Sequence, residues 1–380
     1  MTYHRNDPRK ALFVHSAQIE SYHYPAENPF RPERAGMTRG ILASLGLLSP
    51  EDMLSPTPAT EAELQAFHTP RYLQTLRRAE RGDLDVEGLH MGLGSAECPV
   101  FIGMYDYAAL ACGGTLAGAR AILDGRASVA FNPSGGYHHA RPERAAGFCY
   151  LNDVVLACQL LAGAGKRVLF LDIDVHHDDG VQEAFYRRPD VLTMSFHETG
   201  RTLFPGTGSE DEIGEGPGAG YCVNVPLPPG TRDEEYLKAF RAVGAPILSA
   251  FDPDVIVFEV GMDTLAGDPL AHLDLTNHAP AEVAGIVMGM GKSVLAVGGG
   301  GYHPRNTARG WALIWTILSG QGAEDASCCG LGGVMLESTE WLGGLRDRAL
   351  PHARPDEGLR RGIEETVEKV KANVFRYHGL

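Results

Sequence analysis

The chain has 380 residues, enough for one large domain or two average ones, with 44% hydrophobic and 21% charged residues. Its 48 acidic residues exceed its 33 basic ones, and the net charge of −15 argues against direct nucleic-acid binding through a broad basic face. No apolar run approaches the roughly 20 residues of a membrane span, and the run 11–14 after the basic N-terminus is too short for a signal-peptide core.

The first hundred residues predict one early strand, 11–15, among short helices and loops. A helix is predicted over 34–48, and a second one opens near Phe67. The segment 92–99 is rich in turn residues and predicts a loop. Small residues dominate the helical stretch 105–123, so we expect this helix to pack closely against a sheet.

After residue 127 the chain repeats one pattern, a short apolar strand followed by a polar, glycine-rich loop. The predicted strands are 128–131, 168–173, 191–196, 255–258 and 293–297. The predicted helices are 152–164, 233–250, 280–291, 305–319 and 357–374. Strands joined through helices are parallel, so their loops should emerge at one edge of the sheet and converge. No linker interrupts the pattern, and we predict one domain over 1–380, with a core at about 10–320 and a helical extension at about 321–380.

The seven cysteines are scattered and show no CxxC spacing, which predicts neither a disulfide framework nor a thiolate zinc site. We therefore expect reduced, mostly buried thiols and a cytoplasmic protein. The adjacent Cys328 and Cys329 are a candidate redox pair, but their neighbours are not of a kind that lowers a thiol pKa.

The predicted strand 168–173 leads into a run of charged side chains. Side chains two apart on an extended strand point the same way, so Asp174 and His176 present a carboxylate and an imidazole to one side, with Asp172 behind them. Buried carboxylates need a compensating charge, and a metal ion is the simplest one. A surface turn is the alternative. We favour a metal site because the run follows the carboxyl end of a buried strand.

Asp263, in the loop after strand 255–258, is a third candidate ligand beside Asp174 and His176. Three protein ligands leave a fourth position for water or substrate, which is typical of a catalytic zinc site. Two carboxylates and one imidazole suit Zn²⁺ or Fe²⁺, and the sequence does not distinguish these ions.

Two adjacent histidines, His138 and His139, follow a pair of glycines at the end of a buried strand. A single histidine is more often structural, but this pair favours a general base and acid, whose rings Asp172 and Asp179 could orient. Tyr302 follows four glycines, which place its hydroxyl where it could stabilise an oxyanion. A phosphate-binding loop is the alternative, but neither a GKS/T nor a GxGxxG pattern is present there.

Five motifs resemble those of the zinc-dependent histone deacetylases, above all the class I enzymes and the bacterial acetoin-utilisation deacetylases. They are GGYHHARPERAAGFCYLND at 135–153, DIDVHHDDGVQ at 172–182, FPGTG at 204–208, GMDTLAGDP at 261–269 and GGGGY at 298–302. The resemblance covers roughly residues 10–320. It implies an α/β arginase–deacetylase fold, with a parallel sheet of about eight strands and helices on both faces. It also implies hydrolysis of an N-acetyl amide on the lysine side chain of a protein or peptide.

The resemblance also implies roles for single residues. The metal ligands would be Asp174, His176 and Asp263. His139 would be the general base and acid, His138 would assist electrostatically, and Tyr302 would bind the carbonyl oxygen. The substrate tunnel and its surroundings would include Glu97, Gly147, Phe148, Phe204, Leu270, Gly300 and Arg34. Of these, Glu97 would hold the substrate backbone and Arg34 would lie beside an internal channel for acetate. Family members also bind a structural K⁺, here through Asp172, Asp174, His176, Ser195 and Phe196.

One position departs from the family pattern, because Asp178 stands where the family has glycine. Aspartate tolerates left-handed backbone better than most residues, which makes this exchange conservative. The spacing of Asp174, His176 and Asp178 also resembles the metal-bridging motif of arginases, which hold two Mn²⁺ ions. The second Asp-x-Asp of arginases is absent around Asp263, so a dinuclear hydrolase is the less favoured reading.

The substrate is less certain from the sequence than the reaction. Leu270 stands where relatives specialised for polyamines tend to carry an acid, which favours acyl-lysine peptides over acetylated polyamines. A non-catalytic protein that only binds acetyl-lysine is expected to lack Tyr302 or one of the histidines, and all of these are present.

Overall fold

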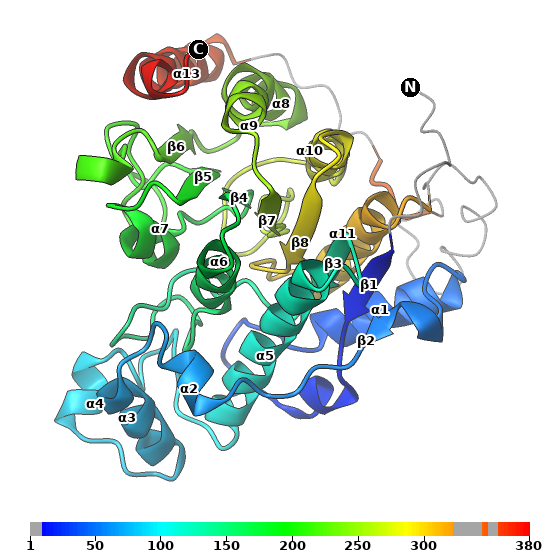
Figure 1. The fold of residues 1–380 in the computed structure, drawn as a ribbon, viewed down its shortest axis with the longest axis vertical. Helices are drawn as coiled ribbons and strands as arrows, with labels where there is room; N and C mark the ends of the chain where they lie inside the picture. Colours follow the sequence, from blue (N-terminus) through cyan, green and yellow to red (C-terminus); the bar gives the residue numbers. More distant parts are fainter. Residues whose placement is uncertain (1–9, 322–343, 349–355) are drawn as a thin grey trace.

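The computed structural model describes residues 10–321, 344–348 and 356–380. Its centre is an eight-stranded sheet of order β2-β1-β3-β8-β7-β4-β5-β6, and every neighbouring pair in it is parallel. The strands are β1 (Ala11–Val14), β2 (Met53–Leu54), β3 (Val129–Asn132), β4 (Val168–Asp172), β5 (Val191–Glu198), β6 (Cys222–Leu227), β7 (Val255–Glu259) and β8 (Ser293–Val297). This confirms the predicted parallel α/β architecture (Figure 1).

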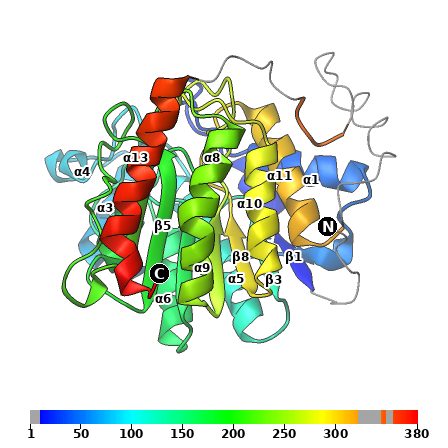
Figure 2. The same cartoon turned by 90° about the horizontal axis from the view of Figure 1, so that it is seen from above.

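Helices cover both faces of the sheet (Figure 2). They are α1 (Arg34–Ser44), α2 (Glu61–Leu64), α3 (Pro70–Glu80), α4 (Val86–His90), α5 (Met104–Leu123), α6 (Asp153–Gly163), α7 (Asp179–Phe185), α8 (Asp233–Ala239), α9 (Ala245–Phe251), α10 (His278–Gly289), α11 (Pro304–Leu318) and α13 (Glu357–Val374). In β4, Leu169 and Leu171 belong to the apolar cluster that includes residues of α1, α8, α9, α10, α11 and α13, whereas Val168 and Phe170 belong to the cluster that includes residues of α5, α6 and α7. Because both faces are covered, the central strands are apolar along most of their length and carry polar residues toward their carboxyl ends.

Helix α5 packs closely on the sheet, as its small residues predicted. A Cβ atom on Gly118 would lie 2.8 Å from Leu295 Cδ1 and 3.1 Å from Ala130 Cβ. A larger side chain here would push the helix away from β3 and β8.

Three of the elements that differ from the prediction have a clear local cause. Strand β2 has only two residues, too few to show a period. Strand β6 contains Pro226, which is tolerated because β6 lies at the edge of the sheet. The predicted helix 233–250 is interrupted by a π-helical turn, Phe240–Gly244, just before Pro246, whose nitrogen carries no hydrogen to donate.

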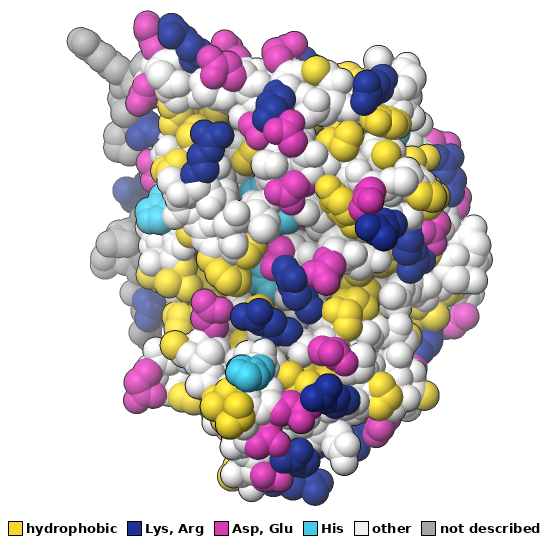
Figure 3. All heavy atoms as spheres, turned by 90° about the vertical axis from the view of Figure 1, so that its left-hand side faces the viewer, with side chains coloured by type: hydrophobic (Ala, Val, Ile, Leu, Met, Phe, Trp, Pro, Cys, Tyr) yellow, Lys and Arg dark blue, Asp and Glu magenta, His cyan; other side chains and the backbone are white. Residues whose placement is uncertain are grey.

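Within the part of the chain that the structure describes, no helix is both long and apolar enough to span a bilayer. Acidic and basic side chains are interspersed on the face that Figure 3 shows, where the described residues form no continuous basic surface. Five cysteines are buried and free, whereas Cys328 and Cys329, like much of the predicted extension 321–380, lie outside the described residues.

Candidate active site

Two aspartate side chains and one histidine side chain meet at the carboxyl ends of β4 and β7. Asp174 and His176 follow β4, and Asp263 follows β7, the neighbouring strand. His176 Nδ1 lies 3.2 Å from Asp174 Oδ1 and 3.0 Å from Asp263 Oδ2. One ligand atom from each of the three residues lies within 4.8 Å of the others, and all three residues are buried.

The electrostatics of this cluster fit a bound cation. Burial and the neighbouring Asp174 raise the pKa of Asp263 to about 8. Burial would lower the pKa of His176, but the two carboxylates raise it to about 10. Without a metal ion, the cluster therefore retains protons that supply the positive charge its carboxylates need. Two carboxylates and one imidazole also form a donor set that suits a divalent transition-metal ion.

Gly300 lies directly against these carboxylates. Its N–H donates to Asp174 Oδ2 at 2.6 Å, and a Cβ atom on it would lie 2.0 Å from Asp263 Oδ2. Only glycine leaves room for the carboxylates here, which explains part of the four-glycine run before Tyr302.

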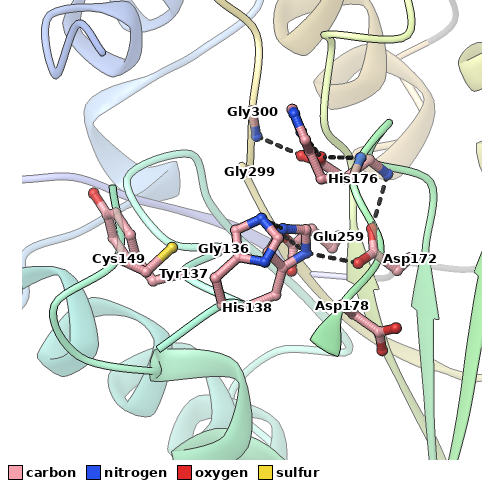
Figure 4. Close-up of polar contacts among 12 residues, drawn as sticks. Gly136, Tyr137, His138, Cys149, Asp172, His176, Asp178, Glu259, Gly299 and Gly300 are labelled. Carbon is pink, nitrogen blue, oxygen red and sulfur yellow. Dashed lines mark hydrogen bonds and ion pairs between the residues drawn. The ribbon is translucent and has the colours of Figure 1, made fainter. Parts of the chain in front are cut away.

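The tandem histidines each pair with a carboxylate. His138 Nδ1 lies 2.8 Å from Asp172 Oδ2, and His139 Nδ1 lies 2.7 Å from Asp179 Oδ1. The two Nε2 atoms face each other at 3.0 Å. All four side chains are buried, and Figure 4 shows His138 lying between Asp172 and the glycine-rich backbone. The predicted partners of both imidazoles are therefore in hydrogen-bond contact with them.

Aromatic rings stand beside the tandem histidines and His176. The Phe204 ring centroid lies 5.0 Å from that of His139 and 6.3 Å from that of His176, and Phe204 is 39% exposed. The Phe148 ring lies 5.4 Å from the Tyr302 ring, which itself lies 6.2 Å from the ring of His176. These rings form apolar walls between the solvent and the charged cluster.

The remaining predicted residues occupy the surroundings. A Cβ atom on Gly147 would lie 2.3 Å from His139 Cδ2, so no side chain fits there. Glu97 is exposed and accepts a hydrogen bond from Gly147 N at 3.1 Å. Leu270 is half-buried, and its N–H donates to Asp268 Oδ1 at 2.9 Å.

Arg34 reaches the floor of the site from the start of α1. Its guanidinium donates to Gly301 O at 2.7 Å and to Gly299 O at 3.1 Å. It lies between the rings of Phe30 and Trp311, 4.6 and 4.9 Å from their centroids. A cavity is lined by Arg34, Tyr107, Tyr137, Gly300 and Tyr302, so this arginine borders an internal cavity, and the acetate channel itself stays a prediction.

The residues predicted to hold K⁺ lie on the neighbouring strands β4 and β5 or in the segment that follows β4. Asp172 and Ser195 are register partners in β4 and β5. Burial and the neighbouring Asp174 raise the pKa of Asp172 well above its ordinary value, so a cation beside it would stabilise the ionised form. The K⁺ site itself stays a prediction.

The structure bears on both readings of Asp178. Its φ of −74° is not left-handed, so the exchange of glycine for aspartate causes no backbone strain here. Its carboxylate lies 3.3 Å from His177 Nε2 and points away from the metal-ligand candidates (Figure 4). Among the described side chains that could share a metal ion, Asp178 belongs to neither group, so it does not act with Asp174 and His176 as an arginase motif would require.

Sequence reasoning missed Glu259, the last residue of β7. Its Oε1 lies 3.2 Å from His138 Nδ1, and neither of its oxygens has a hydrogen-bond partner among the described residues. Burial, followed by the charges of Asp172 and Asp174, raises its pKa well above the ordinary value. The signal that could have found it is the charged residue that ends the apolar strand Val255–Glu259, because a buried carboxylate needs a compensating partner.

A parallel α/β sheet that carries a buried Asp-His-Asp cluster and two His–Asp pairs at its carboxyl edge is typical of a metal-assisted hydrolase. Comparisons with known proteins narrow this class. A family model described as the histone deacetylase domain matches residues 28–318. The acetoin utilization protein AcuC of Bacillus subtilis is 40% identical over 320 residues, which span 82% of this chain and 83% of that protein.

Histone deacetylase 8 of Xenopus tropicalis is 36% identical over 368 residues, 96% of this chain and 97% of that protein. The crystal structure of a histone deacetylase homologue from Aquifex aeolicus superposes with a TM-score of 0.85 at 34% identity, covering 96% of this chain and 100% of that one. The chain belongs to the histone deacetylase family.

Proposed function

We propose that the protein is a zinc-dependent deacetylase that hydrolyses the N-acetyl amide of acetyl-lysine in proteins or peptides, releasing the amine and acetate. The observation that carries the proposal is the convergence of Asp174, His176 and Asp263 beside the tandem His–Asp pairs. Family membership supports the same reaction class. Asp174, His176 and Asp263 would hold Zn²⁺, or Fe²⁺, which when bound polarises a carbonyl and acidifies a water molecule.

The chain's own residues divide the remaining work. His139 Nε2 would accept a proton from the attacking water while Asp179 holds the opposite nitrogen. The Tyr302 hydroxyl would donate to the acetyl oxygen as negative charge develops on it. The leaving amine would then take a proton from the histidine pair. Phe148 and Phe204 would enclose the apolar stem of the lysine and exclude water.

Two further assignments belong to this proposal. Arg34, whose guanidinium borders the inner cavity, would attract the acetate product. A structural K⁺ would be held by Asp172, Asp174, His176, Ser195 and Phe196, and it would compensate the buried Asp172.

A fluorogenic acetyl-lysine peptide tests the proposal directly. We expect turnover that a chelator abolishes and that added Zn²⁺ restores. Acetylputrescine and acetylspermidine are assayed in parallel, because an acetylpolyamine amidohydrolase is the competing reading. Higher kcat/KM for these amines than for the peptide would replace acetyl-lysine as the substrate, and a metal-loaded protein inert toward every acetylated amine would refute the deacetylase assignment.

A further inference from the structure

Glu198, the last residue of β5, is a wholly buried carboxylate that the proposed reaction does not use. Its side chain is 0% exposed. It accepts hydrogen bonds from Thr202 Oγ1 at 2.8 Å, from the backbone N–H of His272 at 2.9 Å and from the His272 imidazole Nδ1 at 2.9 Å. We name Glu198, Thr202 and His272 the rim link, because they connect two loops that border the site.

The first loop carries Phe204. Thr202 lies two residues before Phe204, whose ring stands beside His139. The backbone N–H of Glu198 also donates to Val175 O at 2.9 Å. Val175 lies between the candidate ligands Asp174 and His176. The first loop is therefore anchored, through Glu198, to the segment that carries those ligands.

The second loop runs from Asp263 to His272 and carries Leu270. Asp268 in the middle of this loop accepts hydrogen bonds from Leu270 N at 2.9 Å and from Tyr302 N at 2.7 Å. His272 at its far end binds Glu198. The loop is thus held to Tyr302 in its middle and to the first loop at its end.

The two loops need an internal anchor because their outer parts face solvent. Phe204 is 39% exposed and the His272 side chain is 60% exposed. An ionised carboxylate is costly to bury unless its oxygens are satisfied, and Glu198 meets this requirement only while both loops keep their positions. A shift of the second loop would leave Glu198 Oε2 without its donor, and a shift of the first loop would leave Oε1 with the His272 imidazole alone, so both shifts are unfavourable.

We infer that Glu198 is a positioning residue that sets the width of the tunnel mouth between the Phe204 loop and the Leu270 loop. Through this width it selects substrates with a thin, unbranched stem between the acetamide and the peptide. The inference rests on the proposed deacetylase function and deepens it, because it assigns the stem selectivity to a residue that need not touch the substrate.

The test compares two peptides that differ only in the acetylated side chain. One carries acetyl-lysine. The other carries 4-(acetamidomethyl)phenylalanine, in which an aromatic ring replaces most of the flexible stem between the backbone and the acetamide. We expect the wild type to prefer the linear stem. In Glu198→Ala this preference in kcat/KM should fall about tenfold, mainly through KM, in the range that a misfit of about one methylene produces. Thr202→Val and Glu198→Gln, which each disturb fewer contacts, should show smaller falls in the same direction.

Asp233→Asn is the matched control. Asp233 accepts hydrogen bonds from the backbone N–H of Thr276, at 2.8 Å, and from its hydroxyl, so it anchors the chain just beyond the second loop. This variant should lower the melting temperature without changing the preference between the two peptides. A purely structural role of Glu198 would give the same result in Glu198→Ala.

The inference is overturned if Glu198→Ala is folded by circular dichroism and keeps the wild-type preference. If Glu198→Ala does not fold, unchanged preferences in both Thr202→Val and Glu198→Gln overturn it instead. A wild-type protein that is inert toward both peptides and toward acetylated polyamines would refute the proposed function. This outcome differs from an active enzyme whose Glu198 and Thr202 variants keep the wild-type preference, which would refute only the present inference.

Discussion

The two His–Asp pairs have the same composition and lie side by side, yet their carboxylates behave in opposite ways. Asp172 is wholly buried beside Asp174, and these two causes raise its pKa well above the ordinary value. Burial also acts on Asp179, but hydrogen bonds from His139 and Arg141 hold its pKa well below the ordinary value. The Arg141 contact, at 3.1 Å, has no counterpart among the interactions that Asp172 makes with the described residues.

This difference indicates a division of work. The His139–Asp179 pair carries its own compensating cation, so its carboxylate stays ionised and fixes a neutral imidazole. The His138–Asp172 pair lies among further carboxylates, including Glu259, and would need a bound cation for charge balance. Two residue pairs of the same type can thus take different roles because different charged groups surround their carboxylates.

Replacing the histidines tests the division most severely. His139→Ala should lower kcat by about 10²–10⁴-fold, because it removes the general base. His138→Ala should cost less, since its ring assists without accepting the first proton. Steady-state measurement of kcat for both variants at matched metal content shows which loss is larger. A larger loss in His138→Ala would make His138, rather than His139, the general base.

The carboxylates should differ in the same direction. Asp179→Asn should lower kcat by about 10²–10⁴-fold, because the amide no longer supplies the charge that orients and stabilises the His139 ring. Asp172→Asn should cost only about tenfold, because the amide keeps an oxygen that can accept from His138, whose ring does not take the first proton. Equal losses would show that Arg141 does not distinguish the pairs. Metal analysis of each variant is the control.

The pH dependence of stability should report His139. Burial and the neighbouring His138 lower its pKa from 6.5 to about 4, so the unfolded chain binds more protons between these values. Stability from this group is therefore complete above pH 6.5 and is lost as the pH falls toward 4, by about 3 kcal/mol. Urea unfolding of chelated protein should show this slope, and His139→Gln should flatten it. An unchanged slope in His139→Gln would refute the lowered pKa.

Arg141 should have the smallest effect. Its side chain is 37% exposed and also binds Glu183. Arg141→Ala should therefore lower kcat only about two- to fivefold, in line with the modest strength of exposed ion pairs. Arg144→Ala, an exposed neighbour, serves as the control and should be silent. A loss as large as that of Asp179→Asn would mean that Arg141, rather than Asp179, controls the pair.

Much of the site was predictable because its signals are local. The strands before Asp174 and Asp263 are short apolar runs, and polar side chains directly after parallel strands meet at one edge of the sheet. The pairing of His138 and His139 with Asp172 and Asp179 followed from the need of each imidazole for a partner on its second nitrogen. These inferences required only periodicity and spacing.

The sequence by itself therefore determined the parallel architecture and the residues that gather at its carboxyl edge. Only the tertiary structure decided which charges lie behind them: Glu259 against His138, Arg141 against Asp179, and Glu198 bonded to His272 across 74 positions of the chain. It also decided that the Asp178 carboxylate turns away from the metal-ligand candidates. Such contacts depend on side-chain direction and on packing between distant loops, and neither leaves a periodic pattern along the chain.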